Sequence, residues 1–160
     1  MGKSSEQKTN VMRILDQANA VYAGMCYVET GAISGSEVAD ALGEDHAHVF
    51  KTLVTVGKSG EHYVFVIPVD LGLNLKKAAA AANEKSIEMI KQKELLPLTG
   101  YIHGGCSPIG MKKPFRTFIH NSAESLENIV FSAGKIGYQI KMSPDELKKV
   151  IPFSFADIAE

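Results

Sequence analysis

Residues 100–110 read GYIHGGCSPIG, with four glycines and one proline in eleven residues. Glycine adopts positive φ without steric cost and lets another molecule approach the main chain. The pair Gly104 and Gly105, followed by Ser107 and Pro108, therefore predicts a rigid loop of peptide N–H groups that could face a phosphate or a carbonyl oxygen. A tight connection between two strands explains the same glycines, so both interpretations stand at this point.

Lys51 is the second candidate, because it stands inside the apolar stretch 49–56, VFKTLVTV. In a strand it shares a face with Val49, Leu53 and Thr55. A strand lysine that points into a cleft can hold a phosphate or a carbonyl oxygen as a point charge. An edge-strand lysine that discourages aggregation is the alternative.

The remaining reactive residue types form no known catalytic or metal-binding pattern. Cys26 and Cys106 lie 80 residues apart without a C-x-x-C spacing, which favours buried or loop thiols over a redox pair or a zinc site. The five histidines show no ligand spacing either, so we expect neither a metal nor a cofactor. The chain also lacks the G-x-S-x-G, P-loop and G-x-G-x-x-G motifs of hydrolases, kinases and dinucleotide-binding proteins.

Composition predicts a single globular domain over residues 1–160, since 45% of the residues are hydrophobic and 22% are charged. No 18-residue apolar run or hydrophobic leader is present, so we expect a cytoplasmic protein without a membrane segment. Residues 76–116 carry a net charge of +5, against −4 for 1–75 and −2 for 117–160. This positive third contains the glycine loop and favours an anionic partner, although a solvated surface explains it too.

Local patterns predict the elements that must position these residues. The runs 49–56 and 62–69 flank a turn rich in glycine and should form a hairpin. Further strands are expected at 20–28, 87–90, 117–119, 129–132 and 138–142. Helices are expected at 5–18, capped by Ser4 or Ser5, at 36–43, at 75–83 behind Asn74, at 92–96 before Pro97, and from Ser143 to Val150. His46 and His48 alternate as in the entry to a strand.

This order of elements predicts an α/β fold with a mixed, curled β-sheet and surrounding helices. Strands and short helices alternate irregularly, and the hairpin makes part of the sheet antiparallel.

Four stretches in this order resemble the YbaK family, whose members are free-standing relatives of the editing domain of bacterial prolyl-tRNA synthetase. They are 50–54 (FKTLV), 75–79 (LKKAA), the segment 100–110, and 132–135 (SAGK) with the following Gly137. The resemblance runs from about residue 20 to residue 157, and the ordered combination is more specific than any single piece.

The resemblance implies an editing-domain fold and hydrolysis of mischarged aminoacyl-tRNA, with Cys-tRNA(Pro) as the substrate of the best-known members. In the family's proposed mechanism the substrate's own thiol attacks its ester, and prolyl-tRNA synthetase is a possible partner. Lys51 matches the family's essential lysine. The implied substrate-binding residues are Tyr27, Thr52, Gly104, Gly105, Cys106, Ser107, Pro108, Ile109, Gly110, Ser132 and Gly134.

Three positions depart from the family pattern. Ser34 replaces a pocket phenylalanine, His120 stands where many members have Asp or Asn, and Gln139 stands where some have Asp. These departures leave two alternatives open: a deacylase for Ala- or Ser-charged tRNA, and a non-catalytic module that binds a tRNA end or a protein. The sequence makes no prediction of oligomeric state.

Overall fold

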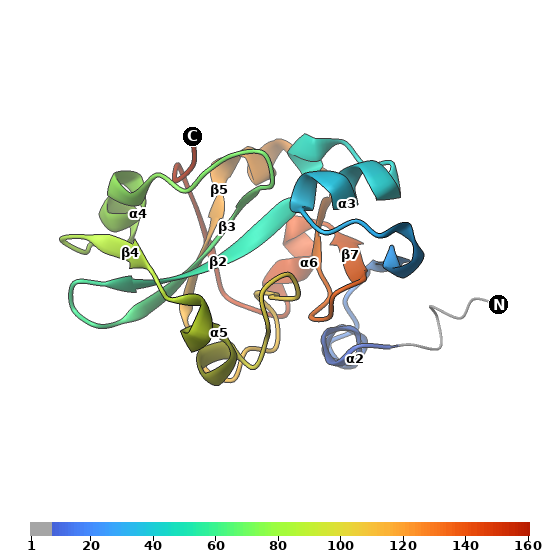
Figure 1. Cartoon of the computed structure of the whole chain (residues 1–160), viewed down its shortest axis with the longest axis horizontal. Coiled ribbons are helices and arrows are strands. Elements are labelled where there is room, and N and C mark those ends of the chain that lie inside the picture. Colours follow the sequence, from blue (N-terminus) through green and yellow to red (C-terminus); the bar gives the residue numbers. More distant parts are fainter. Residues whose placement is uncertain (1–7) are drawn as a thin grey trace.

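The structure is a computed structural model that describes residues 8–160, and its strands form two sheets (Figure 1). The strands are β1 (Ala23–Cys26), β2 (Phe50–Gly57), β3 (His62–Pro68), β4 (Ile87–Met89), β5 (Arg116–His120), β6 (Ile129–Ser132), β7 (Tyr138–Met142) and β8 (Ser154–Ala156). The α-helices are α2 (Asn10–Gln17), α3 (Gly35–Leu42), α4 (Leu75–Ala82), α5 (Gln92–Thr99) and α6 (Pro144–Lys148). Short 3-10 helices are η1 (Val28–Thr30), η2 (His46–His48) and η3 (Asn121–Ser125).

One sheet has the order β1-β7-β6, and the other has the order β4-β2-β3-β5-β8. The larger sheet is mixed, since β2 pairs antiparallel with β3 and β4, while β3–β5 and β5–β8 are parallel. The predicted mixed α/β fold is confirmed. The predicted single curled sheet is instead two sheets, which meet at the parallel bridge between Val49 and Val130.

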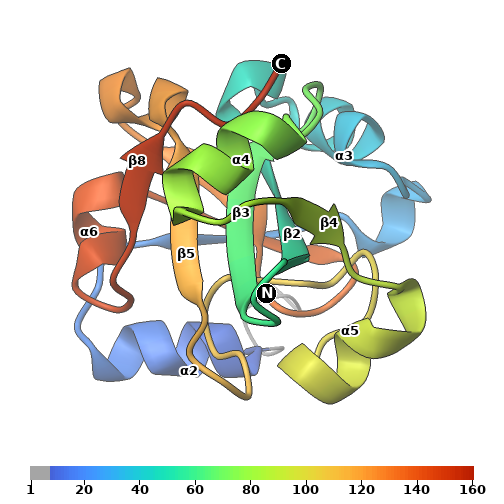
Figure 2. The same cartoon turned by 90° about the vertical axis from the view of Figure 1, so that its left-hand side faces the viewer.

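The hairpin β2–β3 is the centre of the molecule and agrees with its prediction. The register runs from Phe50 opposite Pro68 to Val56 opposite His62. Strand β3 is buried on both faces because apolar clusters cover it from two sides. Val64 and Val66 belong to the cluster shared with α2 and the three-stranded sheet, while α4 packs its alanines against the opposite face (Figure 2).

Several predicted helix ends are confirmed by their caps. The side chain of Asn74 accepts a hydrogen bond from the N–H of Lys77 at the start of α4. Ser143 does the same for Glu146 at the start of α6, where Pro144 is the first helical residue. Gly43 ends α3 with φ +68°, a conformation that glycine adopts easily.

Other predicted boundaries were wrong. Helix α2 is capped by Thr9, and the predicted caps Ser4 and Ser5 lie outside the described residues. Helix α5 continues past Pro97 to Thr99, because the hydroxyl of Thr99 donates to the carbonyl of Leu95 and the N–H of Gly100 donates to that of Leu96.

Strand β1 is shorter than the predicted 20–28, and β8 was not predicted. His46 and His48 lie in the 3-10 helix η2 instead of a strand. Within residues 8–160, no helix has the length and apolar character needed to cross a bilayer.

Candidate active site

A cavity of about 490 Å³ lies where the first half of β2 meets the three-stranded sheet and the start of α3. Its lining comes from eight parts of the chain, which the fold brings together from residue 27 to residue 139. The lining residues are Tyr27, Ile33, Ser34, Gly35, Val38, Val49, Phe50, Lys51, Thr52, Leu53, Val54, Val69, Met89, Ile90, Gln92, Leu95, His103, Gly104, Cys106, Ser132 and Gln139. A second cavity of about 480 Å³, between α2 and β1, contains none of the predicted site residues.

Strand β2 presents an open edge to the larger cavity. Strand β4 pairs with β2 only from Thr55 to Gly57, and the carbonyl of Val54 accepts a hydrogen bond from the N–H of Ile90. Because main-chain groups of alternate residues in a strand point the same way, those of Thr52 also point to this edge. The hydroxyl oxygen of Thr52 is buried and has no hydrogen-bonding partner within residues 8–160.

Lys51 also lines this cavity, and strand alternation puts its side chain on the opposite face of β2 from Thr52. Within the described part of the chain, its ammonium group forms no ion pair. Among residues 8–160, it is the one lysine or arginine of the lining, and no aspartate or glutamate lines the cavity. A single positive charge therefore dominates the electrostatics of this site.

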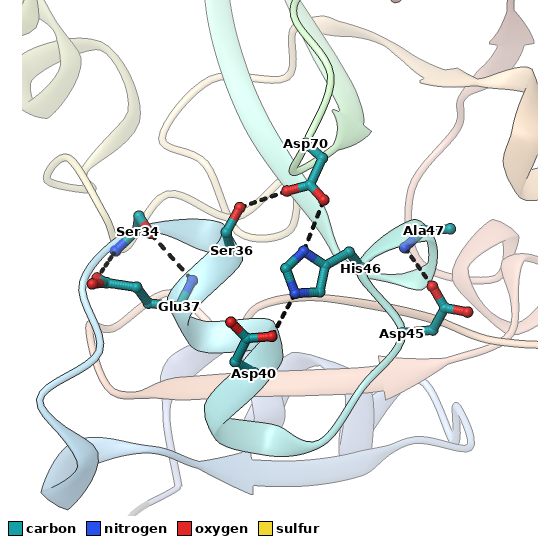
Figure 3. A network of polar contacts seen from close by, with 8 residues as sticks. All are labelled: Ser34, Ser36, Glu37, Asp40, Asp45, His46, Ala47 and Asp70. Atoms are coloured by element: carbon teal, nitrogen blue, oxygen red, sulfur yellow. Dashed lines mark hydrogen bonds and ion pairs between the residues drawn. The ribbon is translucent and has the colours of Figure 1, made fainter.

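The start of α3 forms one wall of the cavity and is held by a capping box (Figure 3). The hydroxyl of Ser34 accepts from the N–H of Glu37, and the carboxylate of Glu37 accepts from the N–H of Ser34. Gly35 follows and lies close to Val69, the residue after β3, because a Cβ at Gly35 would lie 2.6 Å from a methyl carbon of Val69. A glycine is thus needed where helix and strand meet at the cavity wall.

A second polar network ties the same helix to the end of β3 (Figure 3). The imidazole of His46 bridges two carboxylates, with Nδ1 at 2.8 Å from Asp70 and Nε2 at 2.7 Å from Asp40. These hydrogen bonds, first that of Asp40 and then that of Asp70, raise the pKa of His46. The pKa of Asp70 is lowered, first by the Ser36 hydroxyl, then by His46, with a smaller effect of the Lys51 charge.

Three residues of the glycine loop reach the cavity, His103, Gly104 and Cys106. Gly104 has φ +90°, as predicted for this loop. The main-chain N–H groups of Gly104 and Cys106 form no hydrogen bond among residues 8–160, which makes them candidate donors to a ligand oxygen. Burial raises the pKa of the Cys106 thiol to about 12, which keeps it protonated and poorly nucleophilic near neutral pH.

The other predicted loop residues, Gly105, Ser107, Pro108, Ile109 and Gly110, do not line the cavity. Ser107 and Ile109 are fully buried, and the Ser107 hydroxyl accepts from the N–H of Ile109. Gly105 lacks the predicted positive φ, and its N–H donates to the carbonyl of Ile102. Its constraint is steric, since a Cβ there would lie 3.2 Å from the main-chain nitrogen of Ile136.

Of the remaining predicted residues, Tyr27, Thr52 and Ser132 line the cavity and Gly134 does not. Gly134 has φ +90° and packs against Val11, while its N–H donates to the hydroxyl of Ser132. Gly134 therefore helps to hold the Ser132 hydroxyl in place through this hydrogen bond.

The three departures from the family pattern are separated by the fold. Ser34 and Gln139 line the cavity, whereas His120 does not. The Nδ1 atom of His120 lies 2.9 Å from the Ser122 hydroxyl, where it caps η3. His103, Gln92 and Met89 line the cavity although sequence reasoning did not select them. The one feature of the sequence that could have indicated His103 as a lining residue was its position within the glycine loop.

A family model described as the aminoacyl-tRNA editing domain matches residues 30–150, which hold nearly the whole cavity lining. The chain belongs to this family. The resemblance found in the sequence is thereby confirmed, and most of the cavity lies within the matched domain.

Individual relatives agree with this assignment. An Enterococcus faecalis protein with the provisional name Cys-tRNA(Pro)/Cys-tRNA(Cys) deacylase EbsC is 42% identical over 98% of this chain and 96% of its own length. Proline–tRNA ligase of Brachyspira hyodysenteriae is 30% identical over 57% of this chain and 16% of its own length. The crystal structure of a candidate trans-editing enzyme for prolyl-tRNA synthetase has the same fold, with a TM-score of 0.81 at 21% identity over 100% of this chain and 99% of that one.

The chemistry available to this editing domain follows from its lining. The described residues contain no group of three His, Cys, Asp or Glu side chains that could hold a metal ion. Among residues 8–160, the lining contains the Lys51 cation, the imidazole of His103, several hydroxyls and the candidate N–H donors of Gly104 and Cys106, and it contains no carboxylate. Such a site can orient an ester and stabilise negative charge on its carbonyl oxygen.

Proposed function

We propose that this protein deacylates Cys-tRNA(Pro), and that Lys51, Gly104 and Cys106 act directly on the substrate. The observation that carries the proposal is a cavity that has one lysine and no carboxylate among residues 8–160, and whose one lining thiol, that of Cys106, is kept protonated by burial. Such a cavity suits a substrate that brings its own nucleophile. The name of the E. faecalis relative and the partial match to proline–tRNA ligase support cysteine as the amino acid and proline tRNA as its carrier in the substrate.

In the proposed reaction, the thiol sulfur of the esterified cysteine attacks its own ester carbonyl. A carbon–sulfur bond forms, the carbon–oxygen bond to the terminal ribose breaks, and the thiol proton passes to the ribose oxygen. The products are free tRNA and a cyclic thiolactone, which water later opens to cysteine. Holding the two reacting groups in place lowers the barrier by about 7 to 11 kcal/mol in well-oriented systems.

The main-chain N–H groups of Gly104 and Cys106 would stabilise the negative charge that develops on the ester carbonyl oxygen. One well-placed donor of this type contributes about 3 to 4 kcal/mol. Lys51 would bind the phosphate at the 3′ end of the tRNA as a point charge. Tyr27, Thr52 and Ser132 complete the wall around the amino acid.

The proposed substrate is mischarged tRNA, and we place the activity in the cytoplasm. The proposed protein partner is prolyl-tRNA synthetase. The net charge of +5 in residues 76–116 supports binding of the tRNA acceptor end.

The test is a deacylation panel of purified protein with proline tRNA carrying Cys, Ser, Ala or Pro, with Lys51→Met as a negative control. We expect Cys-tRNA(Pro) to lose its ester more than 200-fold faster than Ser-tRNA(Pro). A pocket alone separates near-isosteres by only about 10- to 200-fold, whereas a thiol is far more nucleophilic than a hydroxyl. A thiolactone should be the first product.

Comparable rates for Cys and Ser would contradict the thiol mechanism and favour the alternative deacylase for Ala- or Ser-charged tRNA. Loss of ester from none of these substrates would favour a module that binds a tRNA end or a protein without catalysis.

A further inference from the structure

Two tight turns meet at the edge of the cavity described above. The first spans residues 102–105 and the second spans residues 135–138, and in each the N–H of the last residue donates to the carbonyl of the first. The side chain of Ile136 lies over the first turn, because a Cβ at Gly104 would lie 3.6 Å from its Cδ1 atom. Since Gly104 lines the cavity, the two turns form part of its mouth.

Exposed apolar side chains gather around this mouth. Ile102 in the first turn is 53% exposed, and Ile136 in the second turn is 49% exposed. Val28 is exposed too and lies in contact with the glycine of the second turn. Ile33 and Met89 are exposed residues of the cavity lining itself. These are five of the eight exposed large hydrophobic residues in the described part of the chain, and such a concentration is typical of a binding surface.

The charge around the two turns is positive. The segments that contain them, 95–123 and 128–144, hold no aspartate or glutamate, whereas they hold Lys112, Lys113, Arg116, Lys135 and Lys141. Lys135 is exposed in the second turn and forms no ion pair within residues 8–160. The opposite side of the mouth differs, because the carboxylate of Glu37 accepts from the N–H of Ile33 there. A polyanion is therefore expected along the two turns and not along α3.

We propose that the two turns bind the unpaired cytidines that precede the terminal adenosine of tRNA, with bases against Ile102 and Ile136 and a phosphate at Lys135. This inference rests on the proposed function, because the ester at the end of that strand enters the cavity. Single-stranded RNA offers apolar base faces beside phosphates, and proteins bind it with stacking side chains next to positive charge. The exposed imidazole of His103 in the first turn is a further group on which a base can stack. A paired stem hides its base faces and would leave both isoleucines uncovered.

The experiment compares two cysteinyl esters of the trinucleotide CCA, one intact and one in which both cytosine bases are removed and the phosphates are kept. We expect the kcat/KM of the wild-type protein to favour the intact ester by at least about fivefold, the lower end for one stacked base. Ile136→Ser should abolish most of this preference, and Ile102→Ser should reduce it. Leu75→Ser is the matched control, because Leu75 is 42% exposed at the start of α4, behind the larger sheet, and it should leave the preference unchanged.

Lys135→Met tests the phosphate contact through the salt dependence of binding. Loss of one contact to a single strand should lower the slope of log K against log salt by about 0.7. Lys58→Met, in the exposed hairpin turn beyond the far end of β2, should leave the slope as it is. Equal rates of the wild-type protein on the two esters, or an Ile136→Ser protein that is folded by circular dichroism and keeps the full preference, would overturn the inference while the proposed function stands.

Binding separates the two hypotheses if the wild-type protein deacylates no substrate. Fluorescence anisotropy with an uncharged RNA hairpin that ends in unpaired ACCA, intact or without its two cytosine bases, does not depend on catalysis. Tighter binding of the intact RNA by the wild-type protein, lost in Ile136→Ser, would support the inference even then. Equal binding of both RNAs by the wild-type protein would refute it, and a complex with prolyl-tRNA synthetase that Ile136→Ser weakens would then assign the two turns to that protein.

Discussion

The hydroxyl of Tyr101 donates a hydrogen bond to the carbonyl oxygen of Ile109, which joins the two ends of the glycine loop. A Cβ at Gly110 would lie 2.8 Å from this hydroxyl, and one at Gly134 would lie 3.0 Å from the ring. Tyr101 thus anchors the buried half of the loop against the turn after β6. The other half of the loop, which contains Gly104, lines the cavity.

Tyr101→Phe should lower the free energy of unfolding by about 1 kcal/mol, the value of one net hydrogen bond, and should also reduce the rate of deacylation because the loop loses its anchor. Urea unfolding and single-turnover kinetics measure the two effects. Tyr22→Phe is the matched control, because the Tyr22 hydroxyl bonds Asp16 away from the active site. If both variants lost activity equally, the loop anchor would have no special role.

Lys51→Met should reduce kcat/KM for Cys-tRNA(Pro) by at least tenfold, the lower end of about 10- to 100-fold for a hydrogen bond to a charged group. The melting temperature should hardly change, because the Lys51 ammonium makes no ion pair within residues 8–160. Lys58→Met, in the exposed turn of the hairpin, should change neither quantity. A fully active Lys51→Met protein would remove this residue from the catalytic site.

Cys106→Ala should keep most of the deacylation activity, because burial holds the thiol protonated with a pKa of about 12 and the proposal uses its main-chain N–H. A thiol-alkylating reagent at pH 7.5 should modify the exposed Cys26 well before Cys106, as judged by mass spectrometry. An inactive but folded Cys106→Ala protein would instead point to a nucleophilic cysteine.

The clasp, in which the His46 imidazole hydrogen-bonds to both Asp40 and Asp70, should make the thermal stability of the protein depend on pH. Both carboxylates raise the pKa of His46 above its ordinary value of 6.5. The charged imidazole therefore stabilises the folded state fully below pH 6.5, and this contribution is lost as the pH rises through the pKa of the folded protein. The melting-temperature difference between wild type and His46→Gln should be largest near pH 5.5 and should shrink toward pH 9.

His48→Gln provides the control for this titration, because His48 lies two residues away in η2 and bonds neither carboxylate. Its melting-temperature difference from wild type should not follow the same pH profile. A His46→Gln difference that stayed constant from pH 5.5 to pH 9 would mean that the charge of His46 does not contribute to the clasp.

Local sequence patterns determined most of the elements. The alternation of apolar residues predicted the β2–β3 hairpin, and the runs 129–132 and 138–142 were the strands β6 and β7 to the residue. Asn74 and Ser143 marked helix starts through side chains that cap the next turn. These signals were reliable because each depends on residues within one turn or one strand pair.

Tertiary contacts decided where the local signals failed. Strand β8 exists because it pairs with β5, from Phe118 opposite Ser154 to His120 opposite Ala156, and its three residues carry no strand pattern of their own. Helix α5 passes through Pro97 because hydrogen bonds from Thr99 and Gly100 hold its last turn.

The sequence by itself determined the family, the loop and the two neighbouring candidates Lys51 and Thr52. Only the tertiary structure decided that His103, Gly104 and Cys106 reach the cavity while residues 107–109 are buried in the core. It also separated Gln139, which joins Thr52 at the cavity, from His120, which caps η3 elsewhere. The physical reason is that a cavity between two sheets depends on register and packing across more than 100 residues, and neither is encoded in the spacing of any one motif.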